Sequence, residues 1–156
     1  MGQIVTQNEI IKIVQDGHKN NKTFVVTNGC FDILHIGHAK YLAKTKTFAD
    51  YSIILVNSDS SIKRLKGENR PINNQNDRAE LLTYLSCVDY VVLFEEDSPR
   101  GLLEKIKPNV YTKGADYNIE TLPERDVIIN NNIRVEFIDL IQGKSTTNVI
   151  NKINDK

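Results

Sequence analysis

Two kinds of hydrophobic pattern alternate along the chain. Short, almost continuous apolar runs predict strands buried on both faces of a sheet. Between them, apolar residues recur every three or four positions, which predicts amphipathic helices. Strands are expected at residues 23–27, 51–57, 90–94, 110–112 and 133–138. Helices are expected at residues 9–14 (capped by Asn8 and ended by Gly17), 39–46, 75–86, 98–106 and 145–153, with a short one opened by Thr121 and Pro123.

This alternation predicts a single Rossmann-like α/β domain over residues 1–156. Strands and helices at this spacing form a parallel sheet with helices on both faces, here with five strands. Residues 1–20 would contribute a leading helix, and residues 23–156 the core. Ligands of such sheets bind beyond the carboxyl ends of the strands. Four of the five strands are followed by loops with glycine, basic or hydroxyl residues, at 28–38, 57–70, 113–116 and 142–147.

The first of these loops carries the strongest chemical signal. A β-branched run ends in a turn at Gly29, and His35, Gly37 and His38 follow directly before a helical pattern. Strand, glycine turn and helix together point free backbone N–H groups at an anion. The two histidines add side-chain donors, so we interpret the loop as a phosphate-handling nucleotide site. Alternatives are structural histidines or a two-histidine metal site, although zinc would need a third ligand that is not spaced nearby.

Composition narrows the classes of function. The chain of 156 residues is 40% hydrophobic and 26% charged, with a net charge of zero. It therefore has no global field that would recruit nucleic acid or an anionic membrane. Cys30 and Cys87 do not form a disulfide framework and are expected as reduced thiols. The first 20 residues hold no apolar run typical of a signal peptide or membrane span. These features predict a cytoplasmic protein.

The second loop concentrates positive charge. Lys63, Arg64, Lys66 and Arg70 lie within residues 58–73, which we expect to be a polar loop. In isolation such a cluster is usually a solvated surface, but next to a phosphate site it predicts anion contacts. The acidic residues 95–97 are expected to form a solvated loop.

The motifs also resemble a known family. Residues 29–38, together with Ser145, Thr146 and Thr147 after Gly143, resemble the HxGH-type signature and second motif of the cytidylyltransferase-like nucleotidyltransferases. Within that superfamily the chain is most similar to the heptose-1-phosphate adenylyltransferases of lipopolysaccharide precursor synthesis. The closer resemblance rests on residues 27–32, 56–59, 63–67, 70–71, 94–97 and 113–117.

The resemblance implies a reaction and a set of roles. It implies transfer of AMP from ATP to a sugar 1-phosphate, most closely heptose 1-phosphate, to give ADP-heptose and pyrophosphate. Mg²⁺ or another divalent cation would be held mainly by the phosphates, and Asp32 would either cap the turn or position a water on the metal. Catalytic roles fall to His35, His38 and Lys66, and the acceptor phosphate to Arg64 and Arg70. Nucleotide contacts are expected from Asn28, Gly29, Cys30, Phe31, Gly37, Asn57, Asp59, Lys113, Gly114, Asp116, Gly143, Ser145, Thr146 and Thr147.

One position departs from the cytidylyltransferases. They carry an arginine five residues before the serine of the second motif, where this chain has Leu140. The difference favours an adenylyltransferase over the alternative, a cytidylyltransferase for glycerol 3-phosphate or a similar alcohol phosphate. A second alternative is a nucleotide-binding domain without turnover. The resemblance further implies a homodimer, with a separate sugar kinase as a possible source of the substrate. The zero net charge predicts no nucleic-acid or membrane partner.

Overall fold

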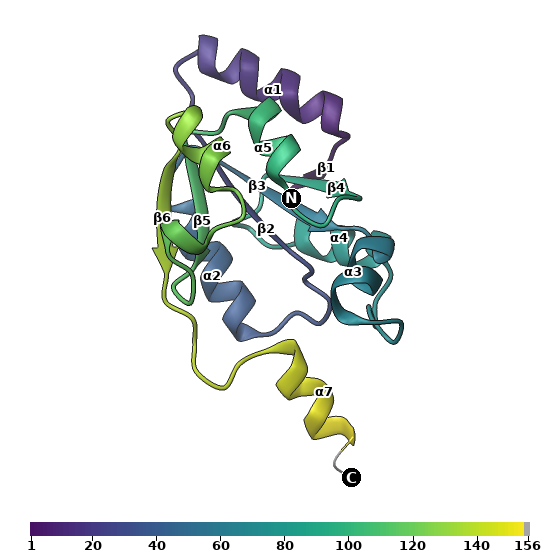
Figure 1. Ribbon diagram of the computed structural model, residues 1–156. Coiled ribbons are helices and arrows are strands. Elements are labelled where there is room, and N and C mark those ends of the chain that lie inside the picture. Colours follow the sequence, from purple (N-terminus) through teal and green to yellow (C-terminus); the bar gives the residue numbers. More distant parts are fainter. Residues whose placement is uncertain (155–156) are drawn as a thin grey trace.

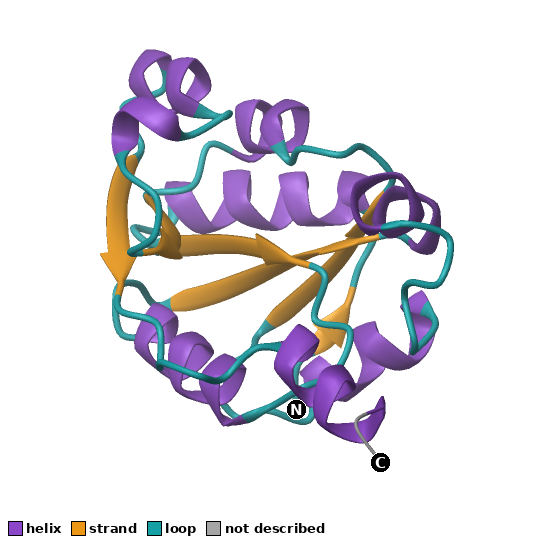
Figure 2. Cartoon of the chain, turned by 60° about the horizontal axis from the view of Figure 1, so that its bottom comes forward, coloured by secondary structure: helices purple, strands orange, loops and turns teal. Residues whose placement is uncertain are grey.

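Six parallel strands form the centre of the molecule, and helices cover both faces of the sheet (Figures 1 and 2). The computed structural model describes residues 1–154. Its strands are β1 (Gln3–Ile4), β2 (Phe24–Gly29), β3 (Tyr51–Asn57), β4 (Tyr90–Phe94), β5 (Val110–Gly114) and β6 (Arg134–Ile138). Its helices are α1 (Gln7–Lys19), α2 (Ile36–Lys46), α3 (Asp59–Lys66), α4 (Gln75–Thr83), α5 (Arg100–Ile106), α6 (Arg125–Asn130) and α7 (Thr146–Asn154), with the 3₁₀ turn η1 (Ile119–Thr121).

The prediction of an α/β domain with a parallel sheet and helices on both faces is confirmed, but the prediction of five strands is wrong. The additional strand, β1, has two residues and pairs with the edge of β4. A strand this short has no measurable periodicity, and its pairing with Tyr90 and Val91 rather than its sequence defines it.

Two local predictions are also corrected. Residues 58–73 are not a continuous loop, because α3 forms inside them, with the Ser58 hydroxyl accepting a hydrogen bond from the Ser61 N–H. The first helix is capped by Thr6 instead of Asn8. Thr6 and Glu9 form a reciprocal capping box, and the helix continues past Gly17.

Strand order fixes where a ligand can bind. The order β1-β4-β3-β2-β5-β6 places β2 in the middle. From β2 the chain winds outward to β3 and β4, then crosses back to β5 on the other side and continues to β6. The loops that leave β2 and β5 therefore diverge and open a crevice at the carboxyl edge of the sheet.

The core has two layers because successive strand residues face opposite ways. In β3, Ile53 and Leu55 pack with α1, α5 and α6, whereas Ile54 and Val56 pack with α2 and α4. All four side chains are fully buried. This is why β3 reads as a continuous apolar run instead of an alternating one.

A buried guanidinium joins the carboxyl ends of β2 and β3 to the helices around them. Arg78 of α4 is only 2% exposed. It donates hydrogen bonds to the backbone carbonyls of Cys30, Asn57 and Asn73 and to the carboxylate of Asp59 at the start of α3. One side chain thus holds the turn after β2, the end of β3, and the beginnings of α3 and α4.

We predict that Arg78→Met costs about 3 kcal/mol or more in the free energy of unfolding, measured by urea denaturation. The substitution keeps side-chain volume but leaves buried carbonyls and the Asp59 carboxylate without a donor. Arg100→Met is the matched control, because Arg100 pairs with Asp126 at the surface and should cost under about 1 kcal/mol. Equal losses in the two variants would contradict the role assigned to Arg78.

Candidate active site

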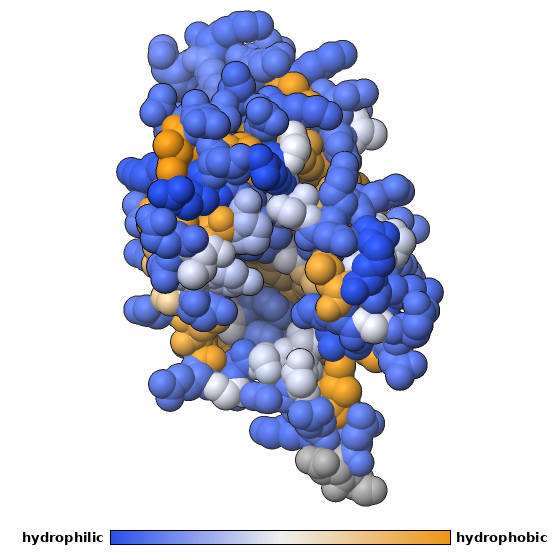
Figure 3. Space-filling view, in the orientation of Figure 1, coloured by the Kyte–Doolittle hydropathy of each residue, from blue (hydrophilic) through white to orange (hydrophobic). Residues whose placement is uncertain are grey.

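A cavity of about 600 Å³ lies at the carboxyl edge of the sheet, between the loops that leave β2 and β5. Figure 3 shows the hollow on the face seen in Figure 1, above the projecting α7. Its wall comes from segments following β2, β3, β4, β5 and β6, together with α2. The crevice predicted by the strand order is therefore a real cavity.

Most residues predicted for the site line this cavity. They are Asn28, Gly29, Cys30, Phe31, His35, Gly37, His38, Asn57, Lys66, Lys113, Gly114, Asp116, Ser145, Thr146 and Thr147. Four predicted residues, Asp59, Arg64, Arg70 and Gly143, are not part of the lining. The sequence interpretation did not assign roles to several residues that do line it: Tyr41, Leu65, Asp97, Ser98, Pro99, Tyr117, Pro123, Glu124, Leu140, Ile141 and Lys144.

The two histidines form a stacked pair at the start of α2. Their ring centroids are 3.8 Å apart, with 24° between the ring planes. His35 is the N-cap residue, and its Nδ1 accepts a hydrogen bond from the Gly37 N–H at 3.1 Å. Since a neutral imidazole that accepts at Nδ1 carries its proton on Nε2, His35 has an Nε2–H available to donate to a ligand.

His38 is neutral at physiological pH in the ligand-free protein. Burial, followed by the nearby positive charge of His35 and Lys66, lowers the pKa of His38 from 6.5 to about 4. The pKa of His35 is also lowered, by burial and then by the charge of Lys144. A bound anion would act in the opposite direction, because it stabilises the imidazolium form.

Gly37 makes room for this pair. A Cβ built at Gly37 would lie 2.9 Å from the His35 ring and 3.4 Å from the Cβ of Lys144. Any larger residue would push the ring of His35 from its place at the N-terminus of α2. The glycine between the histidines is therefore explained by the room that the ring of His35 needs.

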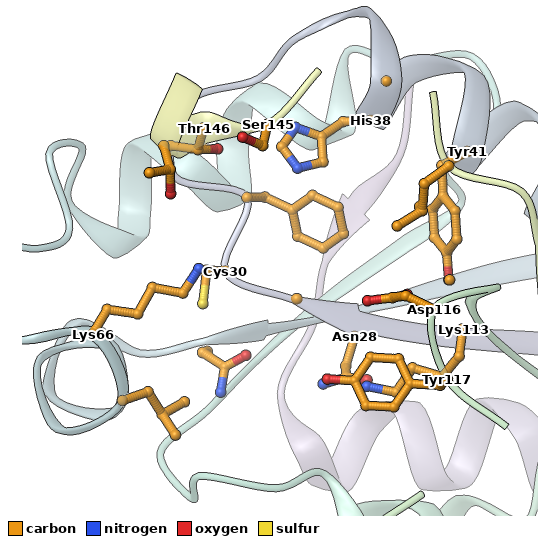
Figure 4. Close-up of a pocket in the computed structure, with 18 of the residues that line it drawn as sticks. Asn28, Cys30, His38, Tyr41, Lys66, Lys113, Asp116, Tyr117, Ser145 and Thr146 are labelled. Atoms are coloured by element: carbon orange, nitrogen blue, oxygen red, sulfur yellow. The ribbon is translucent and has the colours of Figure 1, made fainter. Parts of the chain in front are cut away.

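Further donors surround the histidines. In Figure 4, Ser145 and Thr146 lie beside His38, and the ammonium of Lys66 reaches from the end of α3 toward Cys30. The Ser145 hydroxyl accepts a hydrogen bond from the Asn148 N–H at 3.1 Å, which caps α7 as expected. This end of the cavity thus collects imidazole, ammonium and hydroxyl donors from three separate parts of the chain.

The other end of the cavity has a different chemistry. Figure 4 shows Asn28, Lys113 and Tyr117 grouped there, away from the histidines. The Lys113 ammonium lies 5.1 Å from the ring centroid of Tyr117 and 5.8 Å from that of Tyr111. Burial lowers the pKa of Lys113, while the charges of Glu124 and Asp116 act against that shift.

Partners elsewhere explain why three of the predicted charged residues are outside the lining. Asp59 accepts from Arg78, and Arg64 donates to the Asp97 carboxylate at 2.9 Å. Arg70 donates from Nε to Asp32 at 2.7 Å. Arg64 and Arg70 are thus held by acidic partners, and of the four cations in residues 58–73 only Lys66 lines the cavity.

Asp32 ties down the loop that follows α3. Burial alone would raise the pKa of Asp32, but hydrogen bonds from the N–H groups of Asn73 and Ile72 and from Arg70 outweigh it, so the pKa is lowered. The carboxylate is 2% exposed and is not part of the cavity wall. This agrees with a structural, turn-fixing role for Asp32, the first of the two alternatives raised by the sequence.

The acidic residues 95–97 after β4 are exposed, as expected for a solvated loop, but Asp97 and the following Ser98 also line the cavity. They could have been found from the topology, because β4 ends at the same edge as its neighbours. Among residues 1–154, no three His, Cys, Asp or Glu side chains come together as a metal site. None of the helices in this described part is long and apolar enough to cross a membrane.

The cytidylyltransferase-like family model matches residues 26–152, which include every segment that lines the cavity. The chain belongs to the cytidylyltransferase-like family. The superfamily predicted from the motifs is therefore confirmed, and the match indicates a nucleotidyltransferase enzyme.

Proteins that are similar to this chain in sequence or in structure support the family assignment. The chain is 46% identical over 144 residues to the bifunctional protein HldE of Syntrophotalea carbinolica, covering 92% of this chain and 29% of that protein. It is 52% identical over 137 residues to HldE of Campylobacter concisus, covering 88% and 28%. The chain thus spans less than a third of these relatives. The crystal structure of a lipopolysaccharide core biosynthesis protein from Thermoplasma volcanium is similar, with 30% identity, a TM-score of 0.61 and coverage of 77% of this chain and 97% of that one.

We predict that His38 titrates near pH 4 in the free protein and at higher pH with pyrophosphate bound, measured by imidazole NMR. Because the pKa of His38 is lower in the folded chain than in the unfolded one, its contribution to stability is complete above about pH 6.5. That contribution is lost as the pH falls toward 4. A His38 pKa near 6.5 that stays unchanged when pyrophosphate is added would contradict the buried environment described for this residue.

Proposed function

We propose that the chain transfers AMP from ATP to a sugar 1-phosphate, most closely heptose 1-phosphate, to form an ADP-sugar and pyrophosphate. The observation that carries the proposal is one cavity in which His35, His38, Lys66 and the hydroxyls of residues 145–147 come together. The similarity to HldE proteins supports the same class of reaction.

The reaction needs alignment and charge neutralisation more than an activated nucleophile. The acceptor phosphate has its second pKa near ~6, so it is largely a dianion at neutral pH. One of its oxygens attacks the α-phosphorus of ATP, the bond from that phosphorus to the bridging oxygen breaks, and pyrophosphate leaves with the electron pair. Negative charge builds on the α-phosphate and the leaving group, where preorganised donors lower the barrier.

The donors at the α2 end of the cavity have this role in the proposal. His35 would donate from Nε2, and His38 would become a stronger donor as the incoming phosphates raise its pKa. Lys66 would approach from the end of α3 and neutralise charge between nucleotide and acceptor. Ser145, Thr146 and Thr147 would hold the triphosphate at the N-terminus of α7.

Mg²⁺ would arrive as the chelate of ATP. The groups around the histidines are cationic or hydroxyl donors, and the carboxylate of Asp32 is already occupied by Arg70, Ile72 and Asn73. This donor set suits the outer oxygens of a metal-bound triphosphate, with the phosphates as the main ligands of the ion. A homodimer and a sugar kinase that supplies the substrate complete the proposal as implications of the family resemblance, together with the cytoplasmic location expected from the composition.

Pyrophosphate release tests the proposed function. ATP, CTP and GTP are each combined with heptose 1-phosphate and with glycerol 3-phosphate, and product is measured with a coupled pyrophosphate assay. We expect turnover with ATP and heptose 1-phosphate and little with the other pairs. Turnover with CTP and glycerol 3-phosphate would instead identify a cytidylyltransferase. Tight nucleotide binding without any turnover would identify a binding domain.

We predict that His38→Ala lowers kcat by about 10²–10³-fold, because a donor to the developing charge is lost. Thermal unfolding should change little, since the pair of histidines lies at the cavity wall. His18→Ala is the control: His18 is an exposed histidine of α1 that is hydrogen-bonded to Asn109 and is not part of the cavity lining. If His38→Ala lost stability in proportion to activity, His38 would be a structural residue.

A further inference from the structure

We propose that Glu124 binds a hydroxyl group of the acceptor sugar and helps to select polyhydroxylated acceptors. The inference rests on the proposed function and deepens it, because it assigns the acceptor to one end of the cavity. Nothing in the motifs pointed to this residue. It stands between η1 and α6, outside every segment that the sequence interpretation placed in the site.

The carboxylate of Glu124 is buried and only half satisfied. Glu124 is 2% exposed, yet it forms part of the cavity wall. The Ser98 hydroxyl donates to Oε1 at 2.8 Å. Oε2 is buried and has no hydrogen-bond partner among the described residues. Buried carboxylate oxygens are normally paired, because an unpaired one loses its hydration without compensation.

Glu124 does not use its carboxylate for its own helix. It is the N-cap residue of α6, where a side-chain oxygen normally accepts from the first free N–H groups. Here no such bond forms, and the side chain is directed to Ser98 of the loop after β4. Helix capping therefore does not account for the buried carboxylate.

Asn28 completes a donor and acceptor pair at the same end of the cavity. The Tyr111 hydroxyl donates to the Asn28 Oδ1 at 2.6 Å. That bond fixes the amide with its oxygen engaged, so its NH₂ group is the part left to donate to a ligand. A carboxylate that accepts and an amide that donates match neighbouring hydroxyl groups, each of which can do both.

Because Glu124 is negatively charged, its end of the cavity favours hydroxyl groups, whereas the α2 end favours phosphates. Phosphates are repelled by a carboxylate and attracted by the histidines, Lys66 and Lys144 at the α2 end. A sugar carries its phosphate at one carbon and hydroxyls at the others, so it can lie with its hydroxyls toward Glu124. Lys113 lies with Asn28 (Figure 4) and limits the repulsion between the carboxylate and the anions beyond it.

The pocket must adjust slightly when the sugar binds. Oε2 is shielded from solvent, although Glu124 belongs to the cavity lining. The terminal torsion of a glutamate is soft. Rotation of the carboxylate can therefore bring an oxygen to an arriving hydroxyl while the other keeps the bond from Ser98.

Glu124→Gln tests the proposal, because it keeps the shape and removes the charge and one acceptor. We expect the KM for heptose 1-phosphate to rise about 10- to 100-fold, the effect of losing a hydrogen bond to a charged group. The KM for ATP should stay within about threefold. Ser98→Ala leaves the carboxylate of Glu124 in place but removes the hydroxyl that donates a hydrogen bond to it. This substitution should also raise the KM for heptose 1-phosphate, by a smaller factor.

Glu120→Gln is the matched control, since Glu120 is an exposed carboxylate nearby that pairs with Arg125. Thermal unfolding of each variant separates folding from binding. An unchanged acceptor KM in Glu124→Gln, or a rise in the KM for ATP alone, overturns the inference while the proposed function stands. If the wild-type protein releases no pyrophosphate, the proposed function fails. Calorimetric binding of heptose 1-phosphate to wild type and variant then decides the inference, and equal affinity or no binding overturns it.

Discussion

The hydrogen bonds of one buried guanidinium shape the phosphate end of this protein. Arg78, which is not part of the cavity lining, donates a hydrogen bond to the carbonyl oxygen of Cys30 in the turn after β2. In a trans peptide the carbonyl and the following N–H point in opposite directions, so the N–H of Phe31 is turned away from Arg78. The same side chain fixes the end of β3 and the start of α3, the helix that carries Lys66. A cation outside the cavity thereby orders the turn and the lysine that line it.

Topology then divides the cavity into two chemical halves. Because β2 is central and the chain leaves it in both directions, helices from both faces of the sheet reach the same crevice. The α2 and α7 side contributes histidines and hydroxyls, and the α6 side contributes Glu124. A substrate with phosphates at one end and hydroxyls at the other matches this division. The half with histidines and hydroxyls would not by itself distinguish such a molecule from a simple phosphate.

The sequence predicted those features that depend on neighbours in the chain. The bounds of β3 and β4 follow from apolar runs, and the histidine turn from a compact motif. Helix α3 was missed because Ile62 is its only buried apolar residue and the lysines and arginines around it suggested a loop. Glu124 was missed for a different reason. Its significance depends on Ser98, which is separated from it in the chain by α5, β5 and η1 and reaches it only once these elements have packed.

Helix α7 contributes Thr146 and Thr147 to the cavity but buries none of its own residues, and it projects from the body of the molecule (Figure 1). A tertiary contact to the rest of the protein is the hydrogen bond from the Thr146 hydroxyl to the Ile33 carbonyl at 3.3 Å. Packing energy scales with buried apolar area, so this helix is weakly docked. If the chain acts as proposed, a nucleotide that contacts Thr146 and Thr147 would also have to hold α7 in place, and its measured affinity would be lower than the phosphate contacts alone would give.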